Sequence, residues 1–480
     1  MTHARISRRH FFYGSLLAGA VPAAGFGTSP SLKMLGYKSP NEKLNIAAIG
    51  AGGRAAQDIA GCATENIVAF ADPDSARAEH TFKKYESVPK YTDFRKMLDK
   101  EARKIDAVII AIPDHMHAAA AVWAMERGKH VYVEKPLTRT IWEARLLTEA
   151  ASKYKVATQM GNQGYSNEGA RIAAEIIWSG EIGNVTEVHT WTNRPVWPQG
   201  ISELPAEEAV PDTLDWDTWL GVASMRPYSP AYVPFNWRGW FDFGCGALGD
   251  MACHILGAPN MALMLGAPSS VEVIGQEGKN PYTFPKKSVT RFDFPARGSM
   301  PPVKIFWYDA QTGPAFRPQG IPEDEPLIGG EGAFRGTSPP PLVTAPNGQG
   351  PRPGGQGARA NPLSNGAVFV GDKGYLTTDT YGANVRLLPL ERHKEYKLPP
   401  QFLTRSPGHY RDWIRAAKGG ERACSDFSVA GPFTEWILLG TVALHCEGKL
   451  EWDSARMKFT NSAEANQHIK PKFRKGWQAG

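Results

Sequence analysis

Short apolar runs alternate with amphipathic stretches over the first third of the chain. The runs at 44–49, 66–72, 105–113 and 128–133 are rich in valine, isoleucine and alanine, and each has the length of a strand. Helical spacing of apolar positions fills the intervals between them. Strands and helices in this order predict an α/β fold class with a parallel, right-handed, doubly wound sheet.

A glycine-rich turn follows the first of these runs. Gly50, Gly52 and Gly53 stand between the strand and the next helix, and Ala55 takes the third small position of a dinucleotide fingerprint. Gly50 permits a tight turn, and Gly52 lets the backbone approach a pyrophosphate, which the free amides of the helix start would bind. The alternative interpretation is an ordinary strand–turn–helix unit with no cofactor.

The second run ends at Asp72, 22 residues after Gly50. An acid at this place receives the ribose hydroxyls of a bound dinucleotide. Asp72 and Asp74 together would repel a ribose phosphate, so the sequence favours NAD over NADP as the cofactor.

A lysine stands at the carboxyl end of the fourth run. Lys135 follows Glu134 and precedes Pro136, which ends the strand and restricts the lysine to an extended conformation. A charged side chain there points into the crevice where open α/β sheets bind ligands. The pattern predicts a reactive lysine in a cleft, and the alternative is a lysine that merely ends a strand.

Two histidines follow Pro113 at the end of the third run. His115 and His117 lack a further convergent cysteine or carboxylate at a suitable spacing, so they make a poor zinc site and we expect no metal. We expect His117 to lie beside the cofactor and His115 to be a solvated residue at a helix start.

A second candidate group lies in the stretch WRGWFDFGCGALGDMACHILG. Asp250 and His254 are four residues apart, so on a helix they share one face and reach the same ligand. A histidine changes charge near neutral pH and can accept a hydroxyl proton, which Lys135 can hold or relay. The alternative is that the two side chains only hydrogen-bond to each other.

Five features together resemble the glucose-fructose oxidoreductase, inositol dehydrogenase and rhizopine-catabolism family (Gfo/Idh/MocA). They are GAGGRA, the acid at Asp72, IPDHMH, VEKPLT and GDMACH. The resemblance covers the chain from about residue 42 to its carboxyl end. It implies an NAD-binding Rossmann domain at 41–163 and a C-terminal α/β domain at 164–470 with a large open, mostly antiparallel sheet. In this family that sheet commonly forms the subunit interface, which implies a homo-oligomer.

The resemblance also assigns roles to single residues. It makes Lys135, Asp250 and His254 the catalytic group and places Asn162 against the nicotinamide half of the cofactor. Many relatives carry an aspartate where this chain has Gly257, so the identity of the substrate does not transfer. The full set of expected cofactor contacts is Gly50, Gly52, Gly53, Arg54, Asp72, Pro113, His117, Glu134, Lys135 and Asn162.

Tryptophans concentrate between residues 191 and 240. Flat aromatic faces pack well against pyranose rings, and we expect Trp197 and Trp240 to do so, with Asn193 and Arg194 binding hydroxyl groups. Core packing is the alternative, and we expect it for most of the other tryptophans.

The amino terminus resembles a twin-arginine signal, with Arg8 and Arg9 before a short apolar stretch. That stretch is too short for a membrane span, so residues 1–40 predict export through the twin-arginine machinery and a periplasmic location. Residues 1–40 also hold five bases and no acid, which lowers the net charge of +6 to about +1 for the remainder. This balance gives no reason to expect a nucleic-acid partner. The cysteines show no paired spacing that would indicate a disulfide framework.

The second domain contains a proline- and glycine-rich excursion at 313–365, which is either a mobile linker or a lid over the site. Towards the carboxyl end we expect His445 to be an incidental surface group and the basic stretch from 466 to be a solvated tail.

These features leave three functional hypotheses. The first is an exported oxidoreductase that moves a hydride from a carbohydrate or cyclitol carbinol to a tightly bound NAD. The second is an NAD-dependent glycosidase that oxidises, eliminates, hydrates and reduces one substrate without net redox change. The third is a non-catalytic sugar or nucleotide sensor.

Overall fold

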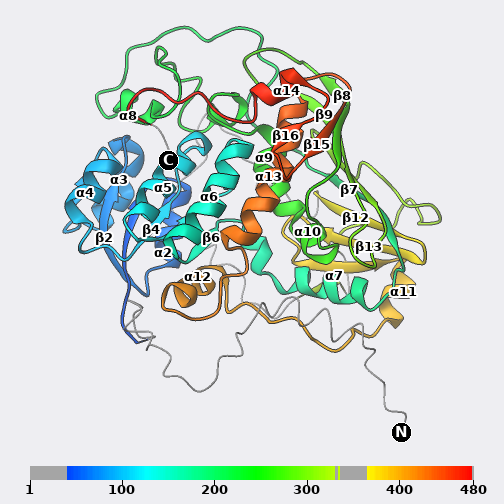
Figure 1. Ribbon diagram of the computed structural model, residues 1–480. Coiled ribbons are helices and arrows are strands. Elements are labelled where there is room, and N and C mark those ends of the chain that lie inside the picture. The colour runs from blue at the N-terminus through cyan, green and yellow to red at the C-terminus, as the bar shows by residue number, and fades with distance from the viewer. Residues whose placement is uncertain (1–40, 330–332, 336–364, 478–480) are drawn as a thin grey trace.

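The computed structural model describes residues 41–329, 333–335 and 365–477, which contain two sheets (Figure 1). The six-stranded sheet has the order β3-β2-β1-β4-β5-β6, and the ten-stranded sheet has the order β11-β14-β13-β12-β7-β10-β9-β8-β15-β16. The predicted signal at 1–40 and residues 336–364 of the excursion lie outside the described residues.

The first sheet is parallel throughout. Its strands are β1 (Asn45–Ile49), β2 (Asn66–Ala71), β3 (Lys90–Tyr91), β4 (Ala107–Ile110), β5 (His130–Val133) and β6 (Thr158–Met160). Its helices are α2 (Arg54–Gly61), α3 (Ser75–Lys84), α4 (Phe94–Glu101), α5 (His117–Glu126) and α6 (Ile141–Tyr154). Side-chain caps mark the starts of α3, α4 and α6, and the cap of α6 is Thr140, which forms a capping box with Glu143. The predicted doubly wound fold is confirmed.

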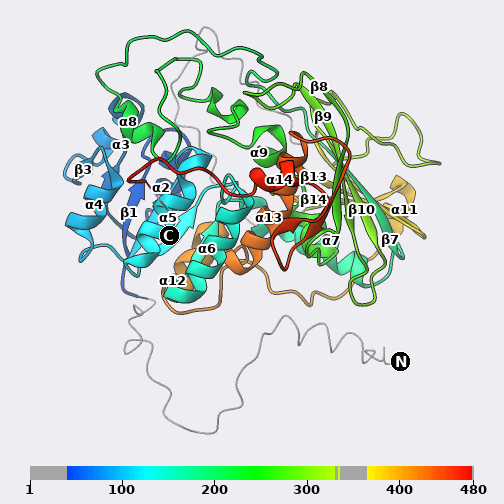
Figure 2. The ribbon, with the colours of Figure 1, turned by 45° about the horizontal axis from the view of Figure 1, so that its top comes forward.

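The second sheet is antiparallel except where β7 pairs with β10. Its strands are β7 (Val185–Trp191), β8 (Ser270–Glu277), β9 (Lys287–Phe294), β10 (Val303–Tyr308), β11 (Phe334–Arg335), β12 (Gly366–Gly371), β13 (Gly374–Asp379), β14 (Asn384–Leu388), β15 (Lys449–Asp453) and β16 (Lys458–Phe459). Helices α7 (Glu168–Trp178), α9 (Gly246–Ile255), α10 (Gly257–Ala262) and α13 (Phe427–Ala443) lie between this sheet and the first domain (Figure 2). The expected large, mostly antiparallel sheet is confirmed.

Other short helices lie around the two sheets. They are α8 (Trp216–Leu220), α11 (Leu390–Glu395), α12 (His409–Ala417) and α14 (Ala463–Gln467). α13 packs against α6 and α9, and α12 packs against β6, so late parts of the chain return to the first domain (Figure 1).

The described part of the excursion packs on the face of the large sheet opposite to the helices. Trp191 and Val368 on that face form a core with Leu327 and Ile328, and the Thr377 hydroxyl donates to the Leu327 carbonyl at 2.7 Å. The described stretch 313–329 is therefore neither a free linker nor a lid against Lys135.

Two expectations near the carboxyl end are wrong. His445 is only partly exposed, because it stacks on His468, with ring centroids 4.1 Å apart, and also contacts Phe241, so it is not an incidental surface group. The basic tail is not a solvated end, because Arg474 donates to the Gly221 carbonyl at 2.8 Å and Trp477 is buried.

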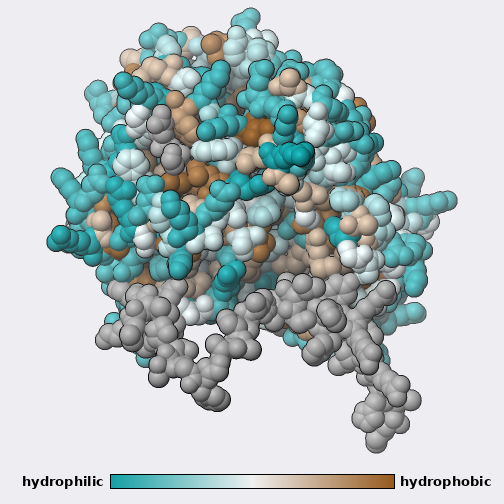
Figure 3. Space-filling model, in the orientation of Figure 1, coloured by the Kyte–Doolittle hydropathy of each residue, from teal (hydrophilic) through white to brown (hydrophobic). Residues whose placement is uncertain are grey.

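Most of the face in Figure 3 is hydrophilic, and apolar side chains appear on it in separate patches. Among the described residues, no helix has both the length and the apolar character that a membrane crossing requires. The described residues also contain no group of three or more histidine, cysteine, aspartate or glutamate side chains that could hold a metal ion.

Candidate active site

The glycine-rich turn joins β1 to α2 and leaves no room for side chains. Gly50 has φ +88°, and a Cβ there would lie 2.4 Å from the Ala111 carbonyl oxygen. A Cβ on Gly52 would lie 2.5 Å from the Arg77 carbonyl oxygen. Without side chains in the turn, its backbone amides are accessible at the amino terminus of α2. This arrangement fits the pyrophosphate of a dinucleotide.

Asp72 follows β2 and faces the same turn. Its carboxylate accepts hydrogen bonds from the Ala51 amide at 2.8 Å and from the Asp74 amide at 3.0 Å. Burial raises the pKa of Asp72, and the two backbone amides oppose that rise. The acid therefore stands fixed at the place where the sequence predicts a ribose contact.

Lys135 and Asp250 form an ion pair between the two domains. The lysine Nζ donates to Asp250 Oδ1 at 2.7 Å and to the Asp250 carbonyl at 2.8 Å. Arg238 contributes a second cation, with Nε 3.3 Å from the same Oδ1. Burial would raise the pKa of Asp250, but Lys135 and Arg238 outweigh burial and hold that pKa well below its usual range.

His254 lies one turn after Asp250 on α9. Burial, and then the positive charge of Lys135, lower its pKa to about 3. Its Nδ1 is buried and has no hydrogen-bond partner among the described residues. A neutral imidazole with an unused ring nitrogen can accept a hydrogen bond from a hydroxyl group.

Asn162, after β6, is completely buried. Its Oδ1 accepts from the Ser425 hydroxyl at 2.7 Å, and its Nδ2 donates to the Cys253 carbonyl at 3.4 Å. The side chain thus ties the end of β6 to α9 beside His254.

The two histidines after Pro113 are both buried. His117 contacts the carbonyls of Pro136 and Ile112 at 2.8 Å each, so its ring nitrogens hold the lysine loop onto the end of β4. The expectation that His115 is solvated is wrong, because its ring packs between Trp219 and Phe243 with no exposed surface.

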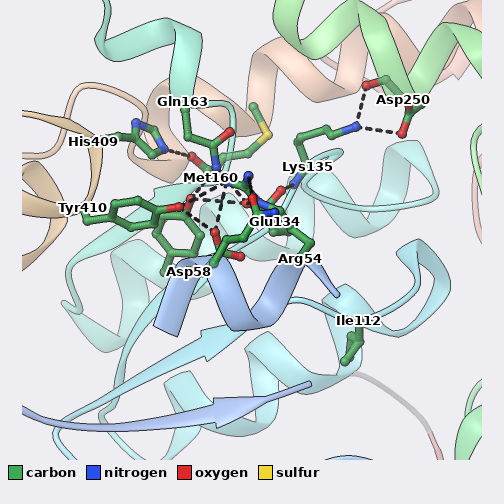
Figure 4. A network of polar contacts seen from close by, with 12 residues as sticks. Arg54, Asp58, Ile112, Glu134, Lys135, Met160, Gln163, Asp250, His409 and Tyr410 are labelled. Carbon is green, nitrogen blue, oxygen red and sulfur yellow. Dashed lines mark hydrogen bonds and ion pairs between the residues drawn. The ribbon is translucent and has the colours of Figure 1, made fainter. Parts of the chain in front are cut away.

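Glu134 belongs to a polar network on the other side of the lysine loop (Figure 4). Its Oε1 accepts from Arg54 Nε at 3.1 Å and from Gln163 Nε2 at 2.8 Å. Tyr410 donates to Asp58 Oδ1 at 2.7 Å and accepts from Arg54 Nη2 at 3.1 Å. Arg54 is therefore held by protein partners at the start of α2, and α12 supports the cofactor side of the site.

Sequence reasoning missed several residues of this region. Arg238 and Tyr410 lie far from Lys135 in the sequence and carry no local signal. Asp114 stands in the IPDHMH motif, but only the fold shows that it is buried near Asp250, where burial raises its pKa to about 7.

The predicted sugar contacts do not gather at the site. Trp240 is 1% exposed and packs against Tyr232, and Trp197 is 4% exposed with its indole N–H donating to Gln199. Both rings pack in the protein interior, because removing their large apolar surface from water stabilises the folded protein. Asn193 and Arg194 follow β7, where their backbones bond to Asn365, Thr192 and Ala310 rather than to the groups around Lys135.

Comparison with known families agrees with this geometry. Residues 44–162 match the NAD-binding Rossmann fold of the Gfo/Idh/MocA oxidoreductase family, and residues 178–279 match its C-terminal alpha/beta domain. The chain is also similar in fold to the WlbA dehydrogenase from Chromobacterium violaceum, solved with NADH and UDP-GlcNAcA. The TM-score is 0.55 at 14% identity, over 87% of this chain and 98% of that one.

Curated relatives match over part of their length. Levoglucosan dehydrogenase of Pseudarthrobacter phenanthrenivorans is 28% identical over 40% of this chain and 40% of its own. Inositol 2-dehydrogenase of Salmonella typhimurium is 31% identical over 31% of this chain and 43% of its own. Glycosyl hydrolase family 109 protein 1 of Shewanella sp. (strain ANA-3) is 31% identical over 34% of this chain and 41% of its own. The alignments therefore span less than half of each relative.

Proposed function

We propose that this chain, an NAD-dependent oxidoreductase of the Gfo/Idh/MocA type, oxidises a secondary alcohol of a carbohydrate or cyclitol. The observation that carries the proposal is the Lys135–Asp250 ion pair with neutral His254 one helical turn away. The names of the relatives, levoglucosan dehydrogenase and inositol 2-dehydrogenase, support this substrate class.

The residues divide the work of proton transfer. Asp250 holds the Lys135 ammonium group in place, and this group can donate a hydrogen bond to the substrate hydroxyl oxygen and stabilise negative charge as it develops. His254 is the side chain placed to accept the hydroxyl proton, because it lies one helical turn from Asp250 and its Nδ1 has no hydrogen-bond partner among the described residues. The bound nicotinamide supplies the hydride acceptor. The glycine turn at 50–53, the start of α2 and Asp72 would hold the dinucleotide.

Substitution at the ion pair tests the proposal. Lys135→Met should lower kcat about 100- to 1,000-fold, the range for loss of a donor that stabilises developing negative charge, while the protein still carries its dinucleotide. NADH formation with a panel of free sugars and cyclitols, together with cofactor released by denaturation, measures both effects.

Lys83→Met is the matched control, because Lys83 is 72% exposed on α3 and its ion-pair partner within the described residues is Glu79, on the same helix. Turnover by Lys135→Met within threefold of the parent protein would rule out the proposed role of the ion pair.

A second candidate function is the redox-neutral glycosidase. Two observations favour it: the similarity to a glycosyl hydrolase family 109 protein, and the buried carboxyl of Asp114, whose pKa of about 7 suits a second acid or base. Release of 4-nitrophenol from aryl glycosides with no net NADH would support this function. Stoichiometric NADH without release of the aglycone would support simple dehydrogenation.

We also propose that the protein is exported to the periplasm through the twin-arginine machinery with NAD already bound. The Arg8 and Arg9 pair before an apolar stretch supports this proposal. Replacing both arginines by lysine should leave the protein in the cytoplasm, which cell fractionation would show.

The large sheet is the expected homo-oligomer interface, and light scattering on the purified protein tests that expectation.

A further inference from the structure

Two large aromatic side chains remain exposed at the ends of the candidate active site. Phe235 and Tyr381 are each 42% exposed, whereas Trp197 and Trp240 are buried. Single exposed apolar residues are ordinary on a protein surface. These two differ because each contacts a residue of the catalytic group or its charged partner, and we call them the aromatic rim.

Tyr381 stands at the His254 end of the site. Its ring meets the imidazole edge-on, with centroids 5.0 Å apart and planes at 73°. The turn after β13 that carries Tyr381 is fixed, because its amide donates to Asp379 and its carbonyl accepts from Asn167 at 3.0 Å. A Cβ on Gly164 would lie 2.6 Å from that carbonyl, so the turn also sits directly on the segment after β6.

Phe235 stands at the Asp250 end. The guanidinium of Arg238 lies 4.5 Å above its ring, and Arg238 reaches Asp250 Oδ1 at 3.3 Å. Trp197 meets the Phe235 ring edge-on, with centroids 5.8 Å apart. One face of Phe235 is therefore held by a cation while the ring keeps its exposed surface beside the ion pair.

The rim residues bracket a polar strip along α9. Asp250 and His254 are separated by about 6 Å along the helix, on the order of the width of one sugar ring. The order along the strip is an aromatic ring, the carboxylate–lysine pair, the imidazole and a second aromatic ring. Hydroxyl groups suit the middle of this strip, and the C–H faces of rings suit its two ends.

From this arrangement we infer that the site binds a ligand of two rings, a glycoside with a sugar or aromatic aglycone, with Phe235 and Tyr381 as stacking contacts. The inference rests on the proposed function and narrows its substrate class from free sugars to glycosides. One ring presents a hydroxyl to Lys135 and His254, and the second ring extends over the rim.

Paired ligands test the inference on the full-length protein with its cofactor. The probes are glucose, galactose, mannose and N-acetylglucosamine, each compared with its 4-nitrophenyl glycoside by saturation-transfer NMR and by turnover. We expect at least one glycoside to bind about tenfold more tightly than its free sugar. Tyr381→Ala and Phe235→Ala should each raise KM for that glycoside about three- to tenfold, with kcat within threefold.

Phe402→Ala is the matched control, because Phe402 is 50% exposed and stacks on Trp178 away from α9. Tyr381→Leu keeps an apolar side chain without a flat ring and should behave as Tyr381→Ala does. Equal affinity for glycosides and free sugars, unchanged KM in both rim variants, or no binding of any probe would each overturn the inference.

The proposed function can fail separately. Loss of turnover in Lys135→Met with no effect of the rim variants would keep the dehydrogenase chemistry and remove the rim. Parent-like turnover in Lys135→Met, together with weakened glycoside binding in the rim variants, would keep the rim and remove the proposed dehydrogenase chemistry.

Discussion

Asp114 carries a carboxyl group whose charge depends on its burial. It is 4% exposed, and burial raises its pKa to about 7, with Arg238 opposing the rise and Asp250 adding to it. The folded protein holds this proton more tightly than the unfolded chain does. The contribution of the protonated Asp114 to the free energy of unfolding is therefore fully present below about pH 4. It is lost as the pH rises through 7.

Asp114→Asn should therefore remove this contribution, so that the variant gains stability relative to the parent as the pH rises from 5 to 7. The parent protein loses up to about 1.4 kcal/mol per pH unit through this group in that window, and the amide variant does not. Denaturant midpoints at both pH values measure the difference. Asp99→Asn, at a side chain that is 58% exposed, serves as the control, and equal slopes in the parent protein and Asp114→Asn would contradict the prediction.

Residues whose role depends on local geometry were predictable from the sequence. Asp250 and His254 share a helix face because they are four residues apart, and Lys135 follows a strand that ends at Val133. Trp240 and Tyr381 were not predictable, because a tryptophan in the core and a tyrosine at the site have the same local pattern. Only the tertiary fold decides which ring stays exposed.

At the level of elements, Gly161 sets how closely β6 approaches the lysine loop. A Cβ at this position would lie 2.4 Å from Glu134 Oε1 and 2.8 Å from the Glu134 Cα. The second contact is with backbone, so rotation of the Glu134 side chain does not relieve it.

Gly161→Ala should therefore push Glu134 and the adjoining Lys135 out of place. We expect a loss of about 1–3 kcal/mol in the free energy of unfolding, typical of overpacking, and at least tenfold lower kcat/KM. Gly266→Ala is the control, since no atom lies within 4 Å of its added Cβ. Parent-like stability and kcat/KM in Gly161→Ala would show that the loop accommodates the methyl group.

The pairing of distant elements was the least predictable part of the fold. α12 has an amphipathic pattern that marks it as a helix, but its docking against α2 depends on Tyr410, 352 residues after its partner Asp58. Likewise the composition of 313–329 marks an irregular segment but does not show which face of the large sheet it covers. Local sequence propensity determines whether a segment forms a helix or strand, whereas contacts between residues far apart in the sequence determine which element packs against it.

The whole molecule carries a set of buried histidines that are neutral when folded. Burial lowers the pKa of His115, His254 and His445 to about 3 and that of His130 and His409 to about 4, from an ordinary value near 6.5. Below pH 6.5 the unfolded chain binds protons that the folded protein does not. The contribution of these histidines to stability is therefore full above about pH 6.5 and falls as the pH drops towards 4, by about 1.4 kcal/mol per pH unit for each such histidine.

His445→Phe isolates one member of this set. Its ring stacks on His468 and Phe241, so a phenyl ring can keep the packing without the titration. The charged and titratable neighbours that lower the pKa of His445 further are His468, Lys279 and Arg139. We expect parent-like stability at pH 7.5 and, at pH 5, a variant more stable than the parent by about 1–2 kcal/mol in urea denaturation. His80→Gln, at an exposed position on α3, is the control and should follow the parent curve. If His445→Phe lost stability as steeply as the parent between pH 7.5 and pH 5, this histidine would not contribute to the acid sensitivity of the fold.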